Sequence, residues 1–198
     1  MKQETRLTLV LLLNLAMIGG LVVVGLSSHS LGVVAAAGDY IADSAAIMLG
    51  LIAIYISRHP HGYPKATSIV ALINCVFLLA VTLFVIFEAV VRLVGHTPEI
   101  EALPVIIVSA IGAIVMIAGI FILGNDDSKE DLHMRSVVLD TISDAVASAA
   151  VAVTGGIILA TKGFYWLDSA VALIIGLVIG YQAVKLIKDV IKDLREKT

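Results

Sequence analysis

Four aspartates lie inside long apolar stretches, where a charged side chain is costly to bury. They form two pairs with the same spacing, Asp39 with Asp43 and Asp140 with Asp144. On a helix, side chains four positions apart share one face and lie one turn apart. Each carboxylate near the centre of a bilayer costs roughly 2.5–3.5 kcal/mol, so such residues usually face a bundle interior or a wet cavity and usually serve function.

Paired carboxylates of this kind predict a cation site. Two like charges one turn apart repel each other, and a shared proton or a bound cation removes that penalty. If the helices that carry the two pairs pack together, four carboxylates converge near the middle of the membrane. Such a set of oxygen ligands suits a divalent cation in tetrahedral or octahedral coordination. The alternative is that the aspartates are protonated and only hydrogen-bond neighbouring helices, as in a structural or assembly subunit.

The composition indicates that these pairs belong to a membrane protein. Of the 198 residues, 60% are hydrophobic and only 15% are charged, and the mean hydropathy is +1.05. These values exclude an ordinary soluble domain. Six apolar stretches are long enough to cross a bilayer as helices, and the ten-residue alternation of a membrane barrel is absent. The sequence therefore predicts an all-α bundle of six transmembrane helices, at about 7–27, 31–57, 66–94, 100–123, 137–160 and 166–187.

The positions of lysine and arginine predict the orientation of the bundle. With the N-terminus inside, 11 of the 13 basic residues fall in cytoplasmic segments, and only Arg92 and Lys162 fall outside. Because short cytoplasmic loops are rich in these residues, we expect both termini to be cytoplasmic. Too few residues follow the sixth span for a folded domain. We therefore expect residues 1–198 to form a single transmembrane domain, without a cytoplasmic C-terminal domain.

Several function classes are excluded or disfavoured by what the sequence lacks. The formal net charge is −3, so there is no basic surface of the kind that binds nucleic acid. Cys75 is the single cysteine, which excludes an intrachain disulfide and a thiolate metal cluster. A phosphate-binding loop of an ATP-driven pump is absent, and the spans hold no paired nucleophile and base of a protease. A passive cation channel remains an alternative, since it too would place acidic residues in its pore.

Other polar residues are weaker candidates for a role in ion binding. Asn14 and Asn74 lie within spans and could line an ion path, although interhelical hydrogen bonds explain them as well. His59 and His61 flank a proline in a cytoplasmic loop and could load metal before transport, or could simply be solvated.

Two further patterns favour structural roles. Glu88 and Arg92 are four positions apart near the end of a span, which predicts an ion pair. Gly176 and Gly180 form a GxxxG pattern, which allows close helix packing within the chain or between subunits.

Several segments, in matching order along nearly the whole chain, resemble the transmembrane part of the cation diffusion facilitator family. The segments that carry the likeness are Asn14, Gly25–Leu31, Asp39–Asp43, His61–Ala66, Ala71–Asn74, Glu88–Leu93, Asp140–Asp144 and Trp166–Asp168. Members of this family are six-helix exporters of zinc and related divalent metals.

The resemblance implies a transport site made by Asp39, Asp43, Asp140 and Asp144. It also implies exchange of metal for protons by alternating access, a homodimer, and a location in the plasma (inner) membrane of a prokaryote. A metal-binding loop between the second and third helices of the family would include His61. The likeness to the zinc, cobalt and cadmium branch implies Zn²⁺ as the transported ion, with Cd²⁺ and Co²⁺ next.

The chain departs from that branch in three ways. Asp140 stands where zinc members typically have histidine, and the resulting all-carboxylate site resembles that of manganese-type members. Leu21 replaces an acidic residue that is common in the first helix. The usual C-terminal metal-binding domain is absent from the sequence. Because oxygen ligands suit harder ions, Mn²⁺ or Fe²⁺ is the alternative substrate.

Overall fold

The computed structural model describes residues 3–57, 64–123 and 132–196. Within these ranges the chain forms six long helices: α1 (Gln3–Ser27), α2 (Leu31–Ser57), α3 (Pro64–Val94), α4 (Ala102–Leu123), α5 (Leu132–Thr161) and α6 (Trp166–Glu196). Each contains a window that is long and apolar enough to cross a membrane. A helix pairs its own backbone polar groups, which is what a segment surrounded by lipid requires.

The helices confirm the predicted spans, with small differences at their ends. The proline that begins α3 suits the first turn of a helix, where its missing N–H has no partner to lose. The largest difference is in α6, which continues to Glu196 rather than ending near 187. Its last turns alternate basic and acidic residues, and such residues continue a helix readily outside the apolar layer.

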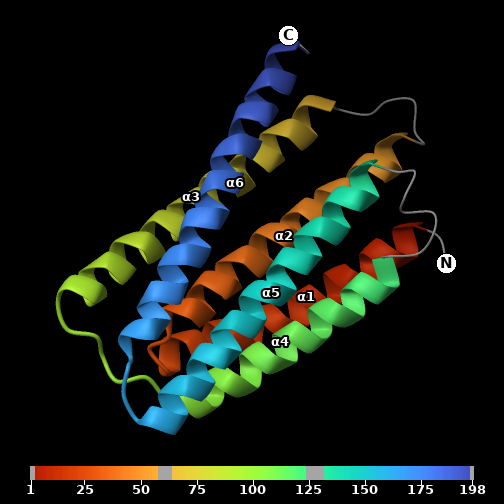
Figure 1. Cartoon of the computed structure of the whole chain (residues 1–198). Helices are drawn as coiled ribbons and strands as arrows, with labels where there is room; N and C mark the ends of the chain where they lie inside the picture. The colour runs from red at the N-terminus through yellow and green to blue at the C-terminus, as the bar shows by residue number, and fades with distance from the viewer. Residues whose placement is uncertain (1–2, 58–63, 124–131, 197–198) are drawn as a thin grey trace.

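The six helices form one bundle with both chain termini at the same end, as Figure 1 shows. We call this end the terminal end and the opposite one the distal end. Helices α3 and α6 pack along each other, as do α4 with α5 and α1 with α2. Helix α5 contacts α2 and α6 over much shorter stretches. The bundle is therefore most loosely joined where α5 faces α2 and α6.

The GxxxG pattern packs α6 against α3 within the chain. A Cβ atom at Gly176 would lie 3.0 Å from Ile86 Cγ1, and one at Gly180 would lie 3.3 Å from Thr82 Cγ2. Only glycine permits so close an approach of the two helices. This is the intrachain alternative of the two that the sequence left open.

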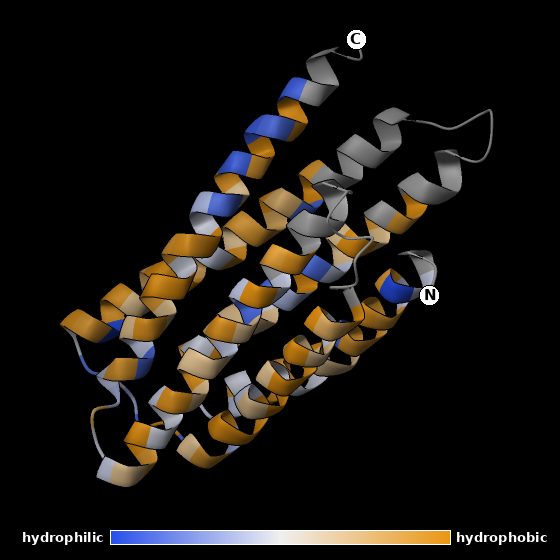
Figure 2. Cartoon of the chain, turned by 45° about the vertical axis from the view of Figure 1, so that its right-hand side comes forward, coloured by the Kyte–Doolittle hydropathy of each residue, from blue (hydrophilic) through white to orange (hydrophobic). Residues whose placement is uncertain are grey.

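The outward surface is that of a protein embedded in lipid. Figure 2 shows hydrophobic residues over most of the ribbon, with hydrophilic residues along the last turns of α6. Large apolar side chains such as Phe87, Phe121 and Tyr181 are exposed on the outside. The chain is a multi-pass membrane protein.

The interior is packed by apolar residues from all six helices. One core cluster includes at least one fully buried side chain from each helix, among them Leu21, Tyr40, Val85, Met116, Val151 and Ala172. A smaller cluster at the terminal end joins Leu7 and Val10 to Ile47. These clusters fix α1, α2, α4 and α5 relative to one another, and thereby the depth of the polar residues among them.

Candidate metal centre

Three of the four predicted aspartates converge inside the bundle. Ligand oxygens of Asp39, Asp43 and Asp144 all lie within 4.8 Å of one another. The first two come from α2 and the third from α5, so the α2–α5 crossing brings the carboxylates together. Asp140 lies on α5 one turn nearer the terminal end, and its side chain is outside the part that the structure describes.

The converging carboxylates are largely withdrawn from the surface. Asp144 is 8% exposed, and Asp39 and Asp43 are half-buried. Asp144 thus lies beside both of the others, and three acidic side chains face one another. Ionised carboxylates this close repel one another, and a proton held on one of them relieves that repulsion. The cluster can therefore hold protons, and a divalent cation would neutralise it in the same way.

A cavity of about 420 Å³ leads away from these carboxylates between α5 and α6. Asp39 and Asp144 line it together with mostly apolar side chains, from the level of Ala150 to that of Gln182. Because α5 and α6 run antiparallel and are joined at the distal end, Gln182 lies near the depth of Asp144, and Ala150 lies nearer the distal end. The cavity therefore extends from the carboxylates along the α5–α6 boundary toward the distal half of the bundle. It lies between α5 and α6, one of the two places where α5 is loosely joined to its neighbours.

A second buried carboxylate, at the distal end, has a different environment. Asp168 is 2% exposed. Its carboxylate accepts hydrogen bonds from Ser30 Oγ at 2.6 Å and from Leu31 N at 2.7 Å, with Gly32 N at 3.4 Å. Ser30 caps α2 by accepting a bond from Val33 N at 3.2 Å. Asp168 thus stabilises the first turn of α2, where free N–H groups attract an anion.

The sequence analysis gave Asp168 no role of its own. The available signal was an acidic residue in the first turn of an apolar helix. Its partners precede it by 136 to 138 positions, so no local pattern could identify them.

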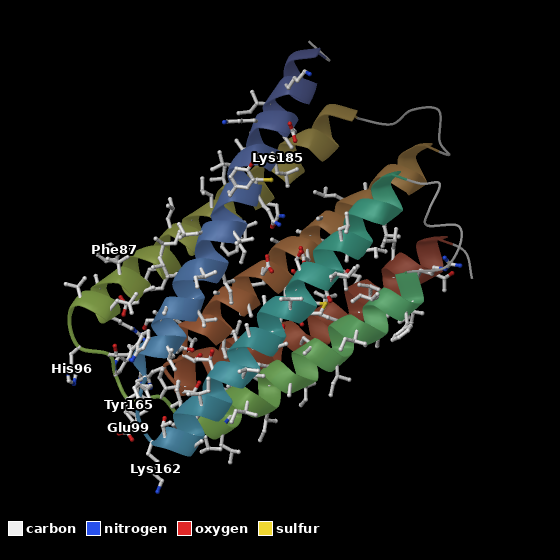
Figure 3. The ribbon with its side chains drawn as sticks, viewed as in Figure 1. Phe87, His96, Glu99, Lys162, Tyr165 and Lys185 are labelled. Carbon is white, nitrogen blue, oxygen red and sulfur yellow. The ribbon has the colours of Figure 1, made fainter. Side chains whose placement is uncertain are left out.

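Further hydrogen bonds close the distal end around the α1–α2 turn. Arg92 Nη1 donates to His29 O at 2.7 Å, and Arg92 Nε pairs with Glu88 Oε1 at 2.9 Å, which confirms the predicted ion pair. The His29 backbone is left-handed, with φ of 59°, as is common just after a helix end. Figure 3 shows Tyr165 and Glu99 at the same end, and the Tyr165 hydroxyl donates to Glu99 Oε1 at 3.1 Å.

The weaker candidates have different outcomes. Asn74 Nδ2 donates to the Ala42 carbonyl at 3.2 Å, which is the interhelical hydrogen bond that the sequence offered as its alternative role. Asn14 is buried, and its Oδ1 has no hydrogen-bond partner within the described residues. His59 and His61 lie outside the described residues.

Comparison with known proteins gives a consistent set of relatives. The chain is 30% identical over 200 residues to a "Cadmium, cobalt and zinc/H(+)-K(+) antiporter" of Bacillus velezensis, a match that covers 96% of the chain and 63% of the relative. It is 28% identical over 178 residues to "Zinc transporter ZitB" of Yersinia pestis, covering 87% of the chain and 56% of the relative.

A third relative is "Metal cation efflux system protein CzcD" of Cupriavidus metallidurans, 30% identical over 162 residues. This match covers 79% of the chain and 50% of the relative. The chain thus spans between half and two thirds of the length of these relatives. Residues 7–195 match the sequence profile of the cation efflux transmembrane domain. The matched residues take in nearly the full length of the six helices that carry and surround the carboxylates. The chain therefore belongs to the cation efflux family.

Proposed function

We propose that the protein exports divalent metal cations from the cytoplasm in exchange for protons, by alternating access, with Zn²⁺ as the main substrate and Cd²⁺ and Co²⁺ next. The observation that carries this proposal is the convergence of Asp39, Asp43 and Asp144 from two helices inside a membrane-spanning bundle. The proposed site also includes Asp140, one turn from Asp144 on the same helix.

The exchange follows from the ligand chemistry. Carboxylates bind a metal only after they lose their protons. Metal bound from the cytoplasm displaces protons, and protons arriving from the other side displace the metal. Either load reduces the charge that the bundle must bury. A loaded site therefore crosses between the two access states more readily than an empty, fully ionised one.

The two ends of the bundle support an inward-facing arrangement. The distal end is tied by the hydrogen bonds of Asp168 and Arg92, whereas Figure 1 shows α6 diverging from α5 toward the terminal end. The predicted topology makes the terminal end cytoplasmic. Opening the other side would require α5 to move relative to α2 and α6, and rigid-body motion of helix groups is the usual route in secondary transporters.

The choice of metal rests on two opposing arguments. The printed names of the relatives include zinc, cadmium and cobalt, and affinity generally favours zinc over manganese at any such site. The all-carboxylate ligand set instead suits harder ions, so Mn²⁺ or Fe²⁺ is the alternative. Asp140→His should shift the ratio of zinc to manganese transport toward zinc, and an unchanged ratio would argue against Asp140 as a ligand.

Reconstituted liposomes that contain metal-sensitive and pH-sensitive dyes test the exchange directly. Wild type is compared with Asp43→Asn plus Asp144→Asn, and with Asp189→Asn as a control that removes an exposed carboxylate from α6. We expect metal entry with opposite proton movement in wild type and in the control, and neither in the double variant.

Two other outcomes would change the proposal. Metal entry without proton movement would favour a passive channel, and an absence of metal entry in wild type would favour a structural membrane subunit. The homodimer and the prokaryotic plasma membrane stay predictions from the family resemblance, and the mass of the purified particle would test the first of them.

A further inference from the structure

Two facing positions on α1 and α2 hold buried oxygens without hydrogen-bond partners. Within the described residues three such side-chain atoms occur, on Asn14, Ser44 and Ser169. Asn14 is 2% exposed and Ser44 is 4% exposed. Leaving a buried polar atom unpaired costs about 1–3 kcal/mol. A ligand that interacts with these oxygens would remove that cost.

At the depth of Gly112 of α4, residues of four helices lie close together, and we call this depth the first level. A Cβ atom at Gly112 would lie 3.1 Å from Tyr40 Oη on α2, 3.6 Å from Met17 Cε on α1 and 3.6 Å from Ser148 Oγ on α5. The Tyr40 hydroxyl also donates to the Gly112 carbonyl at 3.3 Å. These four residues therefore lie at a common depth.

A second level, nearer the terminal end, aligns the same four helices around Val10 of α1. Val10 packs in one core cluster with Ile47 of α2. A Cβ atom at Gly119 of α4 would lie 3.9 Å from Val10 Cγ2 and 3.4 Å from Thr141 Cγ2 of α5. These residues mark a depth about two turns from the first level.

Asn14, Ser44 and Asp144 lie between these two levels, each on its own helix. Each is three or four residues from a member of both levels, so it points to the same side of its helix as those members. On each helix, this side faces the region where α1, α2, α4 and α5 meet. Asn14 and Ser44 therefore lie in the layer of Asp144, on the side of the carboxylate cluster nearest α1.

We infer that Asn14 Oδ1 and Ser44 Oγ complete the coordination of the transported cation. This inference rests on the proposed function, because the carboxylate oxygens supply the other ligands. One oxygen from each of the four aspartates of the proposed site, the amide oxygen of Asn14 and the hydroxyl of Ser44 make six oxygen ligands. Six oxygens in octahedral geometry suit Mn²⁺, whereas a four-coordinate shell suits Zn²⁺. Asn14 thereby sets how well the site accepts ions that prefer six ligands.

The Co²⁺ absorption spectrum of the purified protein tests this inference, because the visible bands of Co²⁺ are much stronger in four-coordinate than in six-coordinate sites. The variants are Asn14→Leu, which removes the oxygen at nearly constant size, and Asn14→Asp, which keeps an oxygen there. Ser44→Ala is a second removal. Thr154→Val is the control, since the hydrogen bond of this buried hydroxyl on α5, within the part of the chain that the structure describes, is to the Ala150 carbonyl of its own helix.

We expect Asn14→Leu to intensify the Co²⁺ bands and to raise the Kd for Mn²⁺ by about tenfold, with a smaller change for Zn²⁺. Ser44→Ala should do the same more weakly, and Asn14→Asp and Thr154→Val should keep the wild-type spectrum. Unchanged spectra and Mn²⁺ to Zn²⁺ ratios in both removal variants would show that Asn14 and Ser44 hold only a structural water and would overturn the inference.

If Asn14→Leu does not fold, Ser44→Ala and Asn14→Asp carry the test. A four-coordinate spectrum in Asn14→Asp would overturn the inference, because an oxygen is still present. A wild-type protein that binds no Co²⁺ would overturn the proposed function itself, an outcome distinct from unchanged variants of a wild type that binds it.

Discussion

The bundle buries carboxylates in two regions that differ in how their oxygens are satisfied. At the distal end, Asp168 accepts hydrogen bonds from a hydroxyl and from the first amides of α2. In the middle of the bundle, Asp39, Asp43 and Asp144 meet one another, and as ionised groups they repel. At the distal end the carboxylate oxygens of Asp168 have hydrogen-bond donors beside them, whereas in the middle of the bundle carboxylate oxygens face other carboxylate oxygens.

This difference distinguishes a structural carboxylate, Asp168, from the carboxylates that we propose to bind metal. A buried charge with well-placed donors is stable as it stands, and its removal leaves those donors unpaired. A cluster of like charges is stable only when protons or a cation join it. Burial alone would not tell the two apart, since both Asp168 and Asp144 are nearly inaccessible.

The largest expected effect is the loss of metal binding in Asp144→Asn. Removing one ligand should raise the Kd for Zn²⁺ by about 100-fold or more, measured by competition with a fluorescent chelator. The melting temperature without metal should not fall, because the substitution also removes like-charge repulsion. A wild-type Kd in this variant would contradict the assignment of Asp144 to the site.

Asp168→Asn should show the opposite pattern. The substitution keeps the size of the side chain but turns one acceptor into a donor that faces the amides of α2. We expect a loss of roughly 1.5–3 kcal/mol in unfolding free energy with an unchanged Kd for Zn²⁺ in the folded fraction. Denaturation in detergent and the same competition assay provide both values. A weakened Kd at wild-type stability would place Asp168 in the site instead.

The pH dependence of metal binding distinguishes the two regions further. Each proton that the metal displaces weakens apparent affinity by about tenfold for every unit of pH decrease. The slope of log Kd against pH should be the same in wild type and Asp168→Asn, and smaller in Asp144→Asn. Isothermal titration at several pH values gives the slopes. Equal slopes in all three proteins would mean that Asp144 releases no proton.

The smallest effect is expected at Tyr165, on the distal surface. Partial desolvation and the hydrogen bond to Glu99 raise the pKa of Tyr165. The unfolded chain therefore loses this proton at a lower pH than the folded chain does. The stabilisation is present below about pH 10 and declines as the pH rises beyond it. Thermal unfolding from pH 9 to 11 should show a slightly shallower decline in Tyr165→Phe, whereas an identical decline would contradict the shift.

The helices and most of the carboxylate site could be predicted because their signals are local. Six apolar windows mark the spans, and the spacing of Asp39 and Asp43 places both on one face of α2. The contact between α2 and α5 could be predicted from one assumption, that the two aspartate pairs with equal spacing form a single site. The apolar span that ends near 187 is shorter than α6, because hydropathy marks where lipid ends, not where a helix ends.

The remaining features depend on contacts between distant segments. The pairing of Asp168 with Ser30 joins residues 138 positions apart. The common layer of Asn14, Ser44 and Asp144 depends on how four helices align in depth, which is set by packing at Gly112 and Gly119. Periodicity gives the face on which a side chain lies, but it does not give the depth of a neighbouring helix.

The position of Asp168 in the last helix bears on how the protein is made. Chains are synthesised from the N-terminus, so α1 and α2 leave the ribosome before α6 is translated. Until then the amides of Leu31 and Gly32 lack the carboxylate that binds them in the finished bundle. The first turn of α2 is therefore complete only after the sixth span is inserted. A chain interrupted before residue 168 would leave the amides of Leu31 and Gly32 without this carboxylate and open to recognition by the quality-control machinery of the membrane.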